Sequence, residues 1–234
     1  MDNSFTIKLT LPYAWFLPRY PFLSTFPILV FMTLISLLIT SGCSGPEPSG
    51  YNYETIDTSR EPLQTAYKGS EYFTLIVKDG SFTIKPAASY KVSAMVAGKK
   101  QYPFNWESDI APFDLALAWG NLAEPEYDRY MTYSQGDRWY FYHYGPGLHL
   151  DIPYIVSHSS NNHIIPSSEN VLKTIRSLSK KERITIEGFL VNVSGSYKGN
   201  PVSWNSSLSR KDTGDGSCEL FYVNKVSIGD KVYE

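Results

Sequence analysis

Apolar and polar residues alternate with period two from Tyr72 onward, and this alternation constrains the fold more than any other feature of the chain. Residues 73–77 and 82–84 flank residues 78–81, whose Asp-Gly pair suits the positive φ angles of a tight hairpin. Residues 89–97 extend the pattern as a third strand. The sequence therefore predicts an antiparallel meander.

Two further segments have strand character. Residues 138–144 carry aromatic side chains on both alternating faces, which is typical of a strand that is covered on both sides or borders a groove. Residues 182–193 alternate again, turn through 194–201, return through Trp204 and continue into 217–223. This last set predicts a second antiparallel unit.

Helix is scarce in the pattern. Residues 167–178 form the best candidate, because Ser167 or Ser168 can cap the start and the apolar residues share one face: Val171, Leu172, Ile175 and Leu178. A second short helix is expected within residues 108–120, beginning near Pro112, whose fixed φ suits a first turn.

The order helix, strand and hairpin in the C-terminal half favours an OB-like barrel. In residues 184–190, Gly188 would provide the bend that closes a small barrel. Strand order is not visible in a sequence, so a β-sandwich stays open. The expected fold class is mainly β with one or two short helices, in a single antiparallel β-barrel or sheet domain, possibly OB-like.

The N-terminal region looks like an export signal. Residues 22–39 are uncharged and follow Lys8 and Arg19, as an apolar region follows a basic one in signal peptides. The residues that follow, Ile39-Thr-Ser-Gly-Cys-Ser-Gly-Pro46, resemble the bacterial lipobox, in which the cysteine is acylated and becomes the mature N-terminus. The resemblance implies a lipid on Cys43, and Gly42 provides the small residue that the signal peptidase requires.

This N-terminus departs from the lipobox pattern in two ways. Thr40 stands where Leu is usual, and the leader is long, with an aromatic-rich stretch at residues 13–20. An uncleaved anchor helix is the alternative, because the apolar run is roughly 18 residues and spanning needs about 17–25. Both versions predict a protein of the bacterial cell envelope that faces the periplasm. Ser44 resembles the pattern of outer-membrane lipoproteins, but inner and outer membrane both stay open.

Three regions are expected. Residues 1–42 form a signal peptide or membrane anchor. Residues 43–70 contain Pro46, Pro48 and Pro62 with neighbouring Gly and Ser and few aliphatic residues, which indicates a flexible tether. Residues 71–234 form the β-rich exported domain.

Four short motifs resemble an uncharacterised family of membrane-anchored or exported bacterial proteins. They read LALAWG at 115–120, RWYF at 138–141, NNHIIP at 161–166 and DTGDGSCE at 212–219. The resemblance implies an exported single domain and brings no activity with it.

Residues that could do chemistry are few. The four histidines, His143, His149, His158 and His163, match no standard ligand spacing and have no paired cysteines nearby, so no metal site is expected. His163 is expected to orient a loop through a backbone carbonyl. The alternative function is a periplasmic hydrolase in which the fold brings His163 to Asp212 or Glu219.

The loop around residue 212 contains Asp-Thr-Gly, as aspartic proteases do. Basic residues rather than an apolar strand precede it, however, and the chain has no second copy. Asp212, Asp215 and Glu219 lack the ligand order of an EF-hand. A solvated loop is therefore expected here, with no cofactor. Cys218 is expected to be buried and inert in its strand.

A binding role fits the composition better than catalysis. A formal net charge of −2 provides no basic footprint, which argues against a nucleic-acid partner. Tyrosine-rich surfaces favour recognition, and the expected binding residues are Trp139, Tyr140, Tyr142, Asn161, His163 and Trp204. The sequence therefore predicts a non-catalytic lipoprotein that is held to the membrane by a lipid or an N-terminal helix and contacts an envelope protein or glycan.

Overall fold

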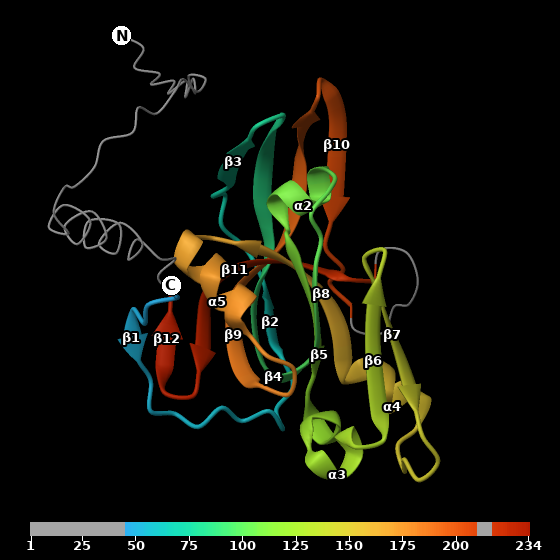
Figure 1. Ribbon diagram of the computed structural model, residues 1–234. Coiled ribbons are helices and arrows are strands. Elements are labelled where there is room, and N and C mark those ends of the chain that lie inside the picture. Colours follow the sequence, from blue (N-terminus) through green and yellow to red (C-terminus); the bar gives the residue numbers. More distant parts are fainter. Residues whose placement is uncertain (1–44, 210–216) are drawn as a thin grey trace, which may run out of the picture. The chain divides into compact units, whose positions relative to one another are not determined.

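The computed structural model describes residues 45–209 and 217–234, and Figure 1 shows that strands dominate this part of the chain. The expected mainly β class with a few short helices is confirmed. No helix among the described residues is long and apolar enough to cross a membrane.

Five strands form the centre of the fold. They are β4 (Gly80–Gln101), β5 (Phe113–Ala118), β8 (Ser159–Pro166), β9 (Arg183–Tyr197) and β11 (Glu219–Ile228). Each pairs with two others in the cyclic order β4, β5, β8, β11, β9 and back to β4. Only the β8–β11 pairing within this ring is parallel. Along the chain, the ring strands follow the order β4, β5, β8, β9 and β11, and a helix lies between β8 and β9. This connectivity resembles that of an OB fold.

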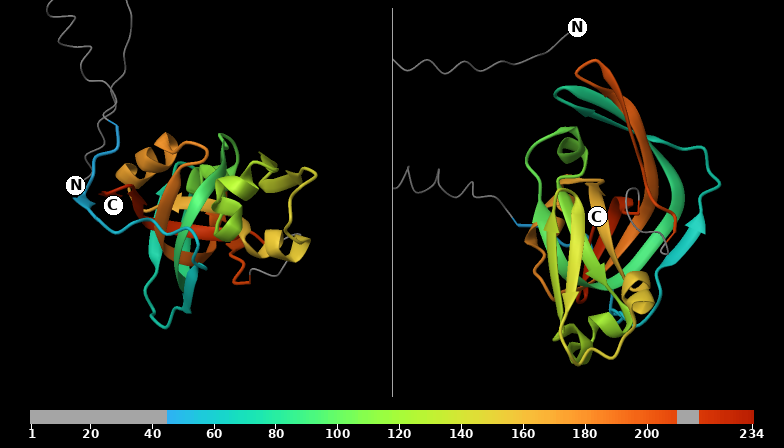
Figure 2. Two further views of the ribbon diagram at one scale, coloured as in Figure 1. Left: turned by 90° about the horizontal axis from the view of Figure 1, so that it is seen from below. Right: turned by 90° about the vertical axis from the view of Figure 1, so that its right-hand side faces the viewer.

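The complete sheet is not closed as a barrel, and the expectation of a barrel is corrected to that extent. Its ten strands run from β1 (Gly50–Tyr51) at one end to β10 (Asn200–Asn205) at the other. β3 (Phe73–Val77) and β10 pair with β4 and β9 beyond the ring, and Figure 2 shows the two resulting hairpin arms extending past it.

The predicted first hairpin is confirmed, because β3 pairs with β4 through Val77 opposite Gly80. Its turn consists of Lys78 and Asp79, however, and neither Asp79 nor Gly80 has the positive φ angle that was expected. The separate third strand at residues 89–97 is wrong. These residues continue β4, which spans 22 residues and passes a bulge between Pro86 and Ala88. A single bulge lets one long strand bend without ending, so the chain needs no second turn.

The best helix candidate is confirmed as α5 (Glu169–Ser177). The Ser168 side chain accepts a hydrogen bond from the Val171 amide at the start, and Val171 and Ile175 are buried against the sheet. At the other end of α5, the Lys99 ammonium donates to the backbone carbonyls of Ile175, Arg176 and Leu178.

The second predicted helix, near Pro112, is wrong. A short helix, α2 (Trp106–Ile110), ends before that proline, and residues 113–118 form β5. Every residue of β5 is buried, because one face lines the ring interior and the other is covered by the segments described next. A short apolar run that is buried on both faces has no period of its own, so the sequence favoured the wrong element.

The chain between β5 and β8 folds over the outer face of β5. It contains a 3₁₀ turn (Gly120–Ala123), α3 (Pro125–Asp128), β6 (Met131–Gly136), β7 (Trp139–Tyr144) and α4 (Ile152–Ser157). β6 and β7 form a separate two-stranded sheet. Met131 and Tyr133 of β6 pack with Ala116 and Ala118 of β5.

Residues 45–70 differ from the flexible tether that their composition suggested. β1 pairs with β12 (Lys231–Tyr233), and β2 (Leu63–Ala66) pairs with β4. Thr58, between them, is 1% exposed. Proline and glycine do not prevent a segment from binding unpaired backbone groups at a sheet edge. We call residues 52–63 the strap, because they cross the outer face of the sheet from β1 to β2.

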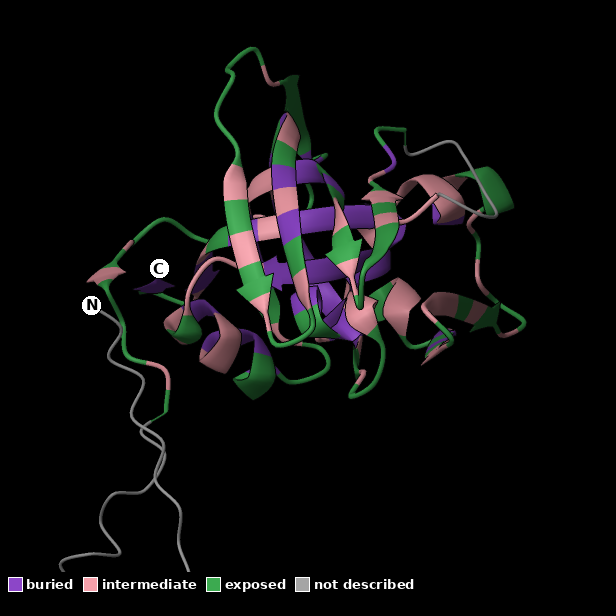
Figure 3. Cartoon of the chain, turned by 90° about the horizontal axis from the view of Figure 1, so that it is seen from above, coloured by how far each residue is buried: buried purple, intermediate pink, exposed green. Residues whose placement is uncertain are grey.

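The main core lies inside the ring, where the central strands are buried and their outer ends are exposed, as Figure 3 shows. Gly188 marks the closest backbone approach in this region. A Cβ atom at this position would lie 2.0 Å from the carbonyl oxygen of Tyr222 on β11, so only glycine lets β9 and β11 come this close. The sequence predicted a bend at Gly188 that closes a barrel, whereas the structure shows this close approach in a sheet that is not closed as a barrel.

Candidate functional site

His163 lies in a buried polar cluster on the outer face of the ring. Asp114 on β5 stands directly opposite His163 on β8. His163 Nδ1 donates to Asp114 Oδ1 at 2.9 Å, because a carboxylate can only accept. Arg138 Nη1 donates to the same oxygen at 2.7 Å. We call Asp114, Arg138 and His163 the buried triad.

The buried triad connects three parts of the fold. Arg138 also donates to the backbone carbonyl of Ala111 at 3.0 Å and to Ser108 Oγ at 2.9 Å, and both residues lie in or beside α2. The Trp204 ring on β10 has its centroid 4.7 Å from that of the His163 imidazole. The α2 loop, the β6–β7 hairpin and the ring are therefore held together by one network.

Burial limits what the buried triad can do chemically. The side chains of Asp114 and His163 are 0% and 4% exposed, and Trp204 packs against the imidazole. A general base must reach the proton that it abstracts from a substrate. The His163–Asp114 pair has the orientation of a catalytic pair but is closed to a substrate in this conformation.

The other carboxylates proposed for His163 have different positions. Asp212 and Asp215 lie outside the described residues. Glu219 is buried at the start of β11, where it stands beside Asn162 rather than His163. Strand alternation places His163 and Asn162 on opposite faces of β8. The structure therefore pairs His163 with Asp114, and not with a backbone carbonyl as expected.

The remaining histidines are dispersed. His143 and His149 are exposed, whereas His158 stacks on Tyr154 with ring centroids 3.7 Å apart and places Nε2 2.9 Å from Glu61 Oε1. In residues 45–209 and 217–234, no group of three His, Cys, Asp or Glu side chains could hold a metal ion. Cys218 is half-buried, with its sulfur 3.9 Å from the Arg138 carbonyl oxygen.

Of the six expected binding residues, Asn161 and His163 are buried and the four aromatic ones are half-buried. Asn161 is 1% exposed, and its amide donates to the Arg138 carbonyl at 3.0 Å. The Tyr140 hydroxyl lies 3.1 Å from Ser159 Oγ, and burial raises the pKa of Tyr140 to about 12. Trp139 and Tyr142 are half-buried, as is Trp204.

Sequence reasoning missed Asp114 and Arg138. A usable signal was present, because Asp114 is the one charged residue in the apolar run 113–118. A buried charge needs a partner of opposite sign.

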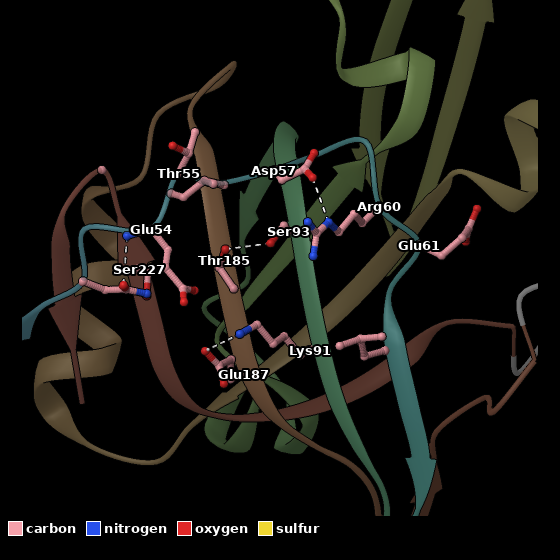
Figure 4. A pocket seen from close by; sticks show the side chains of 14 residues that line it. Glu54, Thr55, Asp57, Arg60, Glu61, Lys91, Ser93, Thr185, Glu187 and Ser227 are labelled. Carbon is pink, nitrogen blue, oxygen red and sulfur yellow. Dashed lines mark hydrogen bonds and ion pairs between the residues drawn. The ribbon is translucent and has the colours of Figure 1, made fainter.

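An open polar groove lies under the strap, on the outer face of β4, β9 and β11 (Figure 4). Its volume is about 460 Å³. On its floor, Ser93 Oγ and Thr185 Oγ1 are 2.8 Å apart, and Lys91 Nζ lies 3.3 Å from Glu187 Oε1. Glu54 extends from the strap toward this floor. We call this hollow the strap groove.

Its lining consists mainly of hydroxyl and charged groups, and both signs of charge are present. The lining contains more acidic than basic side chains: Lys91 and Arg60 are the basic ones, and the acidic ones are Glu54, Asp57, Glu61 and Glu187. Hydrogen bonds and charge are therefore available to hold a ligand here, beside the apolar side chains of Ile56 and Leu63.

The strap is fixed near its middle. The Gly120 amide donates to the Thr58 carbonyl at 2.8 Å, and Arg183 Nη1 donates to Thr58 Oγ1 at 3.0 Å. The strap groove therefore has a fixed wall on the strap side.

Comparison with protein-family models, curated proteins and solved structures finds no match to this chain. The class defined by the fold is a mainly β domain with OB-type ring connectivity, a buried ionic triad and an open polar groove.

Proposed function

We propose that the protein is a bacterial envelope lipoprotein, anchored through Cys43, whose folded domain binds an envelope protein and does not catalyse a reaction. The strap groove is the binding site. The observation that carries this proposal is the contrast between the open groove and the closed His163–Asp114 pair.

The chemistry of the strap groove favours a polar protein segment over a glycan. Its lining offers hydroxyl groups and charges of both signs but no aromatic side chain. Sugar rings commonly stack on aromatic faces, whereas a polar peptide can pair with Lys91, Glu187 and Glu54 through hydrogen bonds and charge.

Anchoring is tested by replacing Cys43 with serine and following size and membrane fractionation in the producing cell. If the protein is a lipoprotein, the Cys43→Ser variant receives no lipid and keeps its signal peptide, so its electrophoretic mobility changes. Unchanged mobility together with unchanged membrane retention would overturn the lipid anchor and favour the uncleaved helix.

Binding is tested with a photo-crosslinking amino acid at Glu54, which is exposed on the strap, and at Lys78 on the β3–β4 turn as the matched exposed control. We expect one protein adduct of defined size from position 54 only, and we expect the additional change Glu187→Lys to abolish it. Equal labelling at both positions, or a glycan adduct, contradicts the proposal.

The hydrolase alternative keeps one observation in its favour, the 2.9 Å bond between His163 and Asp114. It requires the Trp204 side of the cluster to open. If Trp204→Ala exposes His163 and no hydrolysis of ester or peptide substrates follows, this alternative fails.

A further inference from the structure

The folded domain begins almost directly after the proposed lipid-bearing residue. The backbone of Glu47 makes two hydrogen bonds with the Asn170 side chain, N–H to Oδ1 at 2.9 Å and C=O from Nδ2 at 2.8 Å. Cys43 precedes Glu47 by four positions in the sequence. Four residues span about 14 Å at most, which is less than the thickness of a small domain.

The chain stays attached to the domain after Glu47. The amides of Ser49 and Asn52 donate to the carbonyls of Val232 at 2.7 Å and Asp230 at 2.8 Å. β1 pairs with β12 over the same stretch, with Gly50 opposite Val232. The segment from Glu47 to Asn52 is therefore held against the edge of the sheet.

Two exposed tyrosines follow Glu47 closely in the sequence, one in β1 and one at the start of the strap. Tyr51 is 61% exposed and Tyr53 is 86% exposed, and Tyr51 stands opposite Lys231 in the β1–β12 register. Tyrosine is enriched at membrane–water interfaces because it combines an apolar ring with a polar tip. A lysine beside it can keep its ammonium group in the headgroup layer.

We propose that the surface formed by β1, β12 and the first turn of α5 lies against the headgroups of the membrane that holds the lipid. This surface is the membrane face, and its assignment rests on the proposed acylation of Cys43. Glu47, which precedes β1, is exposed. Since carboxylates are repelled by anionic lipid, the membrane face fits a zwitterionic headgroup surface.

The experiment uses full-length acylated protein, processed in cells and reconstituted into phosphatidylcholine vesicles. Mass spectrometry first establishes the lipid on Cys43, so a failure of acylation is recognised separately. In a Cys218→Ser background, one fluorophore is placed at Lys231→Cys on the membrane face. A second protein carries it at Lys78→Cys, on the tip of the β3–β4 arm, which Figure 1 shows away from β1 and β12.

Lipids with nitroxide-labelled headgroups serve as quenchers. We expect quenching at position 231 to exceed that at position 78 at least three-fold. Equal quenching at the two positions in acylated protein overturns the membrane face.

The tyrosines are tested in the same assay. The double change Tyr51→Ala and Tyr53→Ala is expected to halve the quenching at position 231, while circular dichroism stays unchanged because both rings are exposed. Undiminished quenching overturns the contact of the tyrosines with the headgroups.

Discussion

Replacing Asp114 with alanine is expected to destabilise the protein far more than removal of a surface carboxylate. The change leaves the Arg138 guanidinium, whose side chain is 16% exposed, without the carboxylate that accepts its 2.7 Å hydrogen bond. Breaking a buried ion pair from one side costs about 3–5 kcal/mol. For a domain of this size, this loss lowers the Tm by roughly 6–20 °C.

The measurement is thermal unfolding by circular dichroism at neutral pH on the purified full-length protein. Glu187→Gln is the matched control, because Glu187 lies 3.3 Å from both Lys91 and Lys225 but is 27% exposed. Such pairs contribute about 0–1 kcal/mol. A Tm for Asp114→Ala within about 2 °C of this control would refute the reasoning.

A double variant separates the charge from the packing. Asp114→Ala combined with Arg138→Met removes both charges, so much of the lost stability should return. If the double variant is as unstable as the sum of the two single changes, the ionic explanation is wrong.

Three further outcomes follow from the structure. Gly188→Ala should cost about 1–3 kcal/mol or prevent folding, because its Cβ would meet the Tyr222 carbonyl, whereas Gly136→Ala, which has open space, should leave the Tm unchanged. Burial raises the pKa of Tyr140 from 10.0 to about 12 in the folded protein, so the stability linked to its neutral hydroxyl is present below pH 10 and is lost as the pH rises toward 12. In denaturant titrations between pH 10 and 12, the free energy of unfolding should therefore fall less for Tyr140→Phe than for the unchanged protein, by roughly 2–3 kcal/mol at most. Lys99→Met should remove the hydrogen bonds to the carbonyls at the C-terminal end of α5. The helix should then open more often, which would be measured as faster amide hydrogen exchange confined to α5.

Local patterns predicted the elements whose signals lie within a few residues. The first hairpin, the alternation in 182–193 and the capping serine of α5 depend on neighbours in sequence, and all three are present in the structure. The predictions failed where burial depends on distant segments. β5 looked helical because nothing near it shows that both of its faces are covered.

The same limit applies to the candidate site. His163 was singled out from the sequence, but its partner Asp114 lies 49 residues away in sequence, and the spacing of the four histidines carries no trace of this pairing. Residues 45–70 were mistaken for a tether because they are held to the domain by backbone hydrogen bonds, from β1 to β12 and from β2 to β4. Backbone groups are the same in every residue, so composition cannot reveal them.

The position of β11 in the ring has a consequence for the order in which the protein can fold. β11 pairs with both β8 and β9, and β12, which follows it, is the partner of β1. Until residues 219–228 are available, β8 and β9 each lack one neighbour and the ring cannot be completed. Contacts between distant segments also slow folding. A chain that is synthesised from its N-terminus would therefore remain incompletely folded until residues 219–233 had been made.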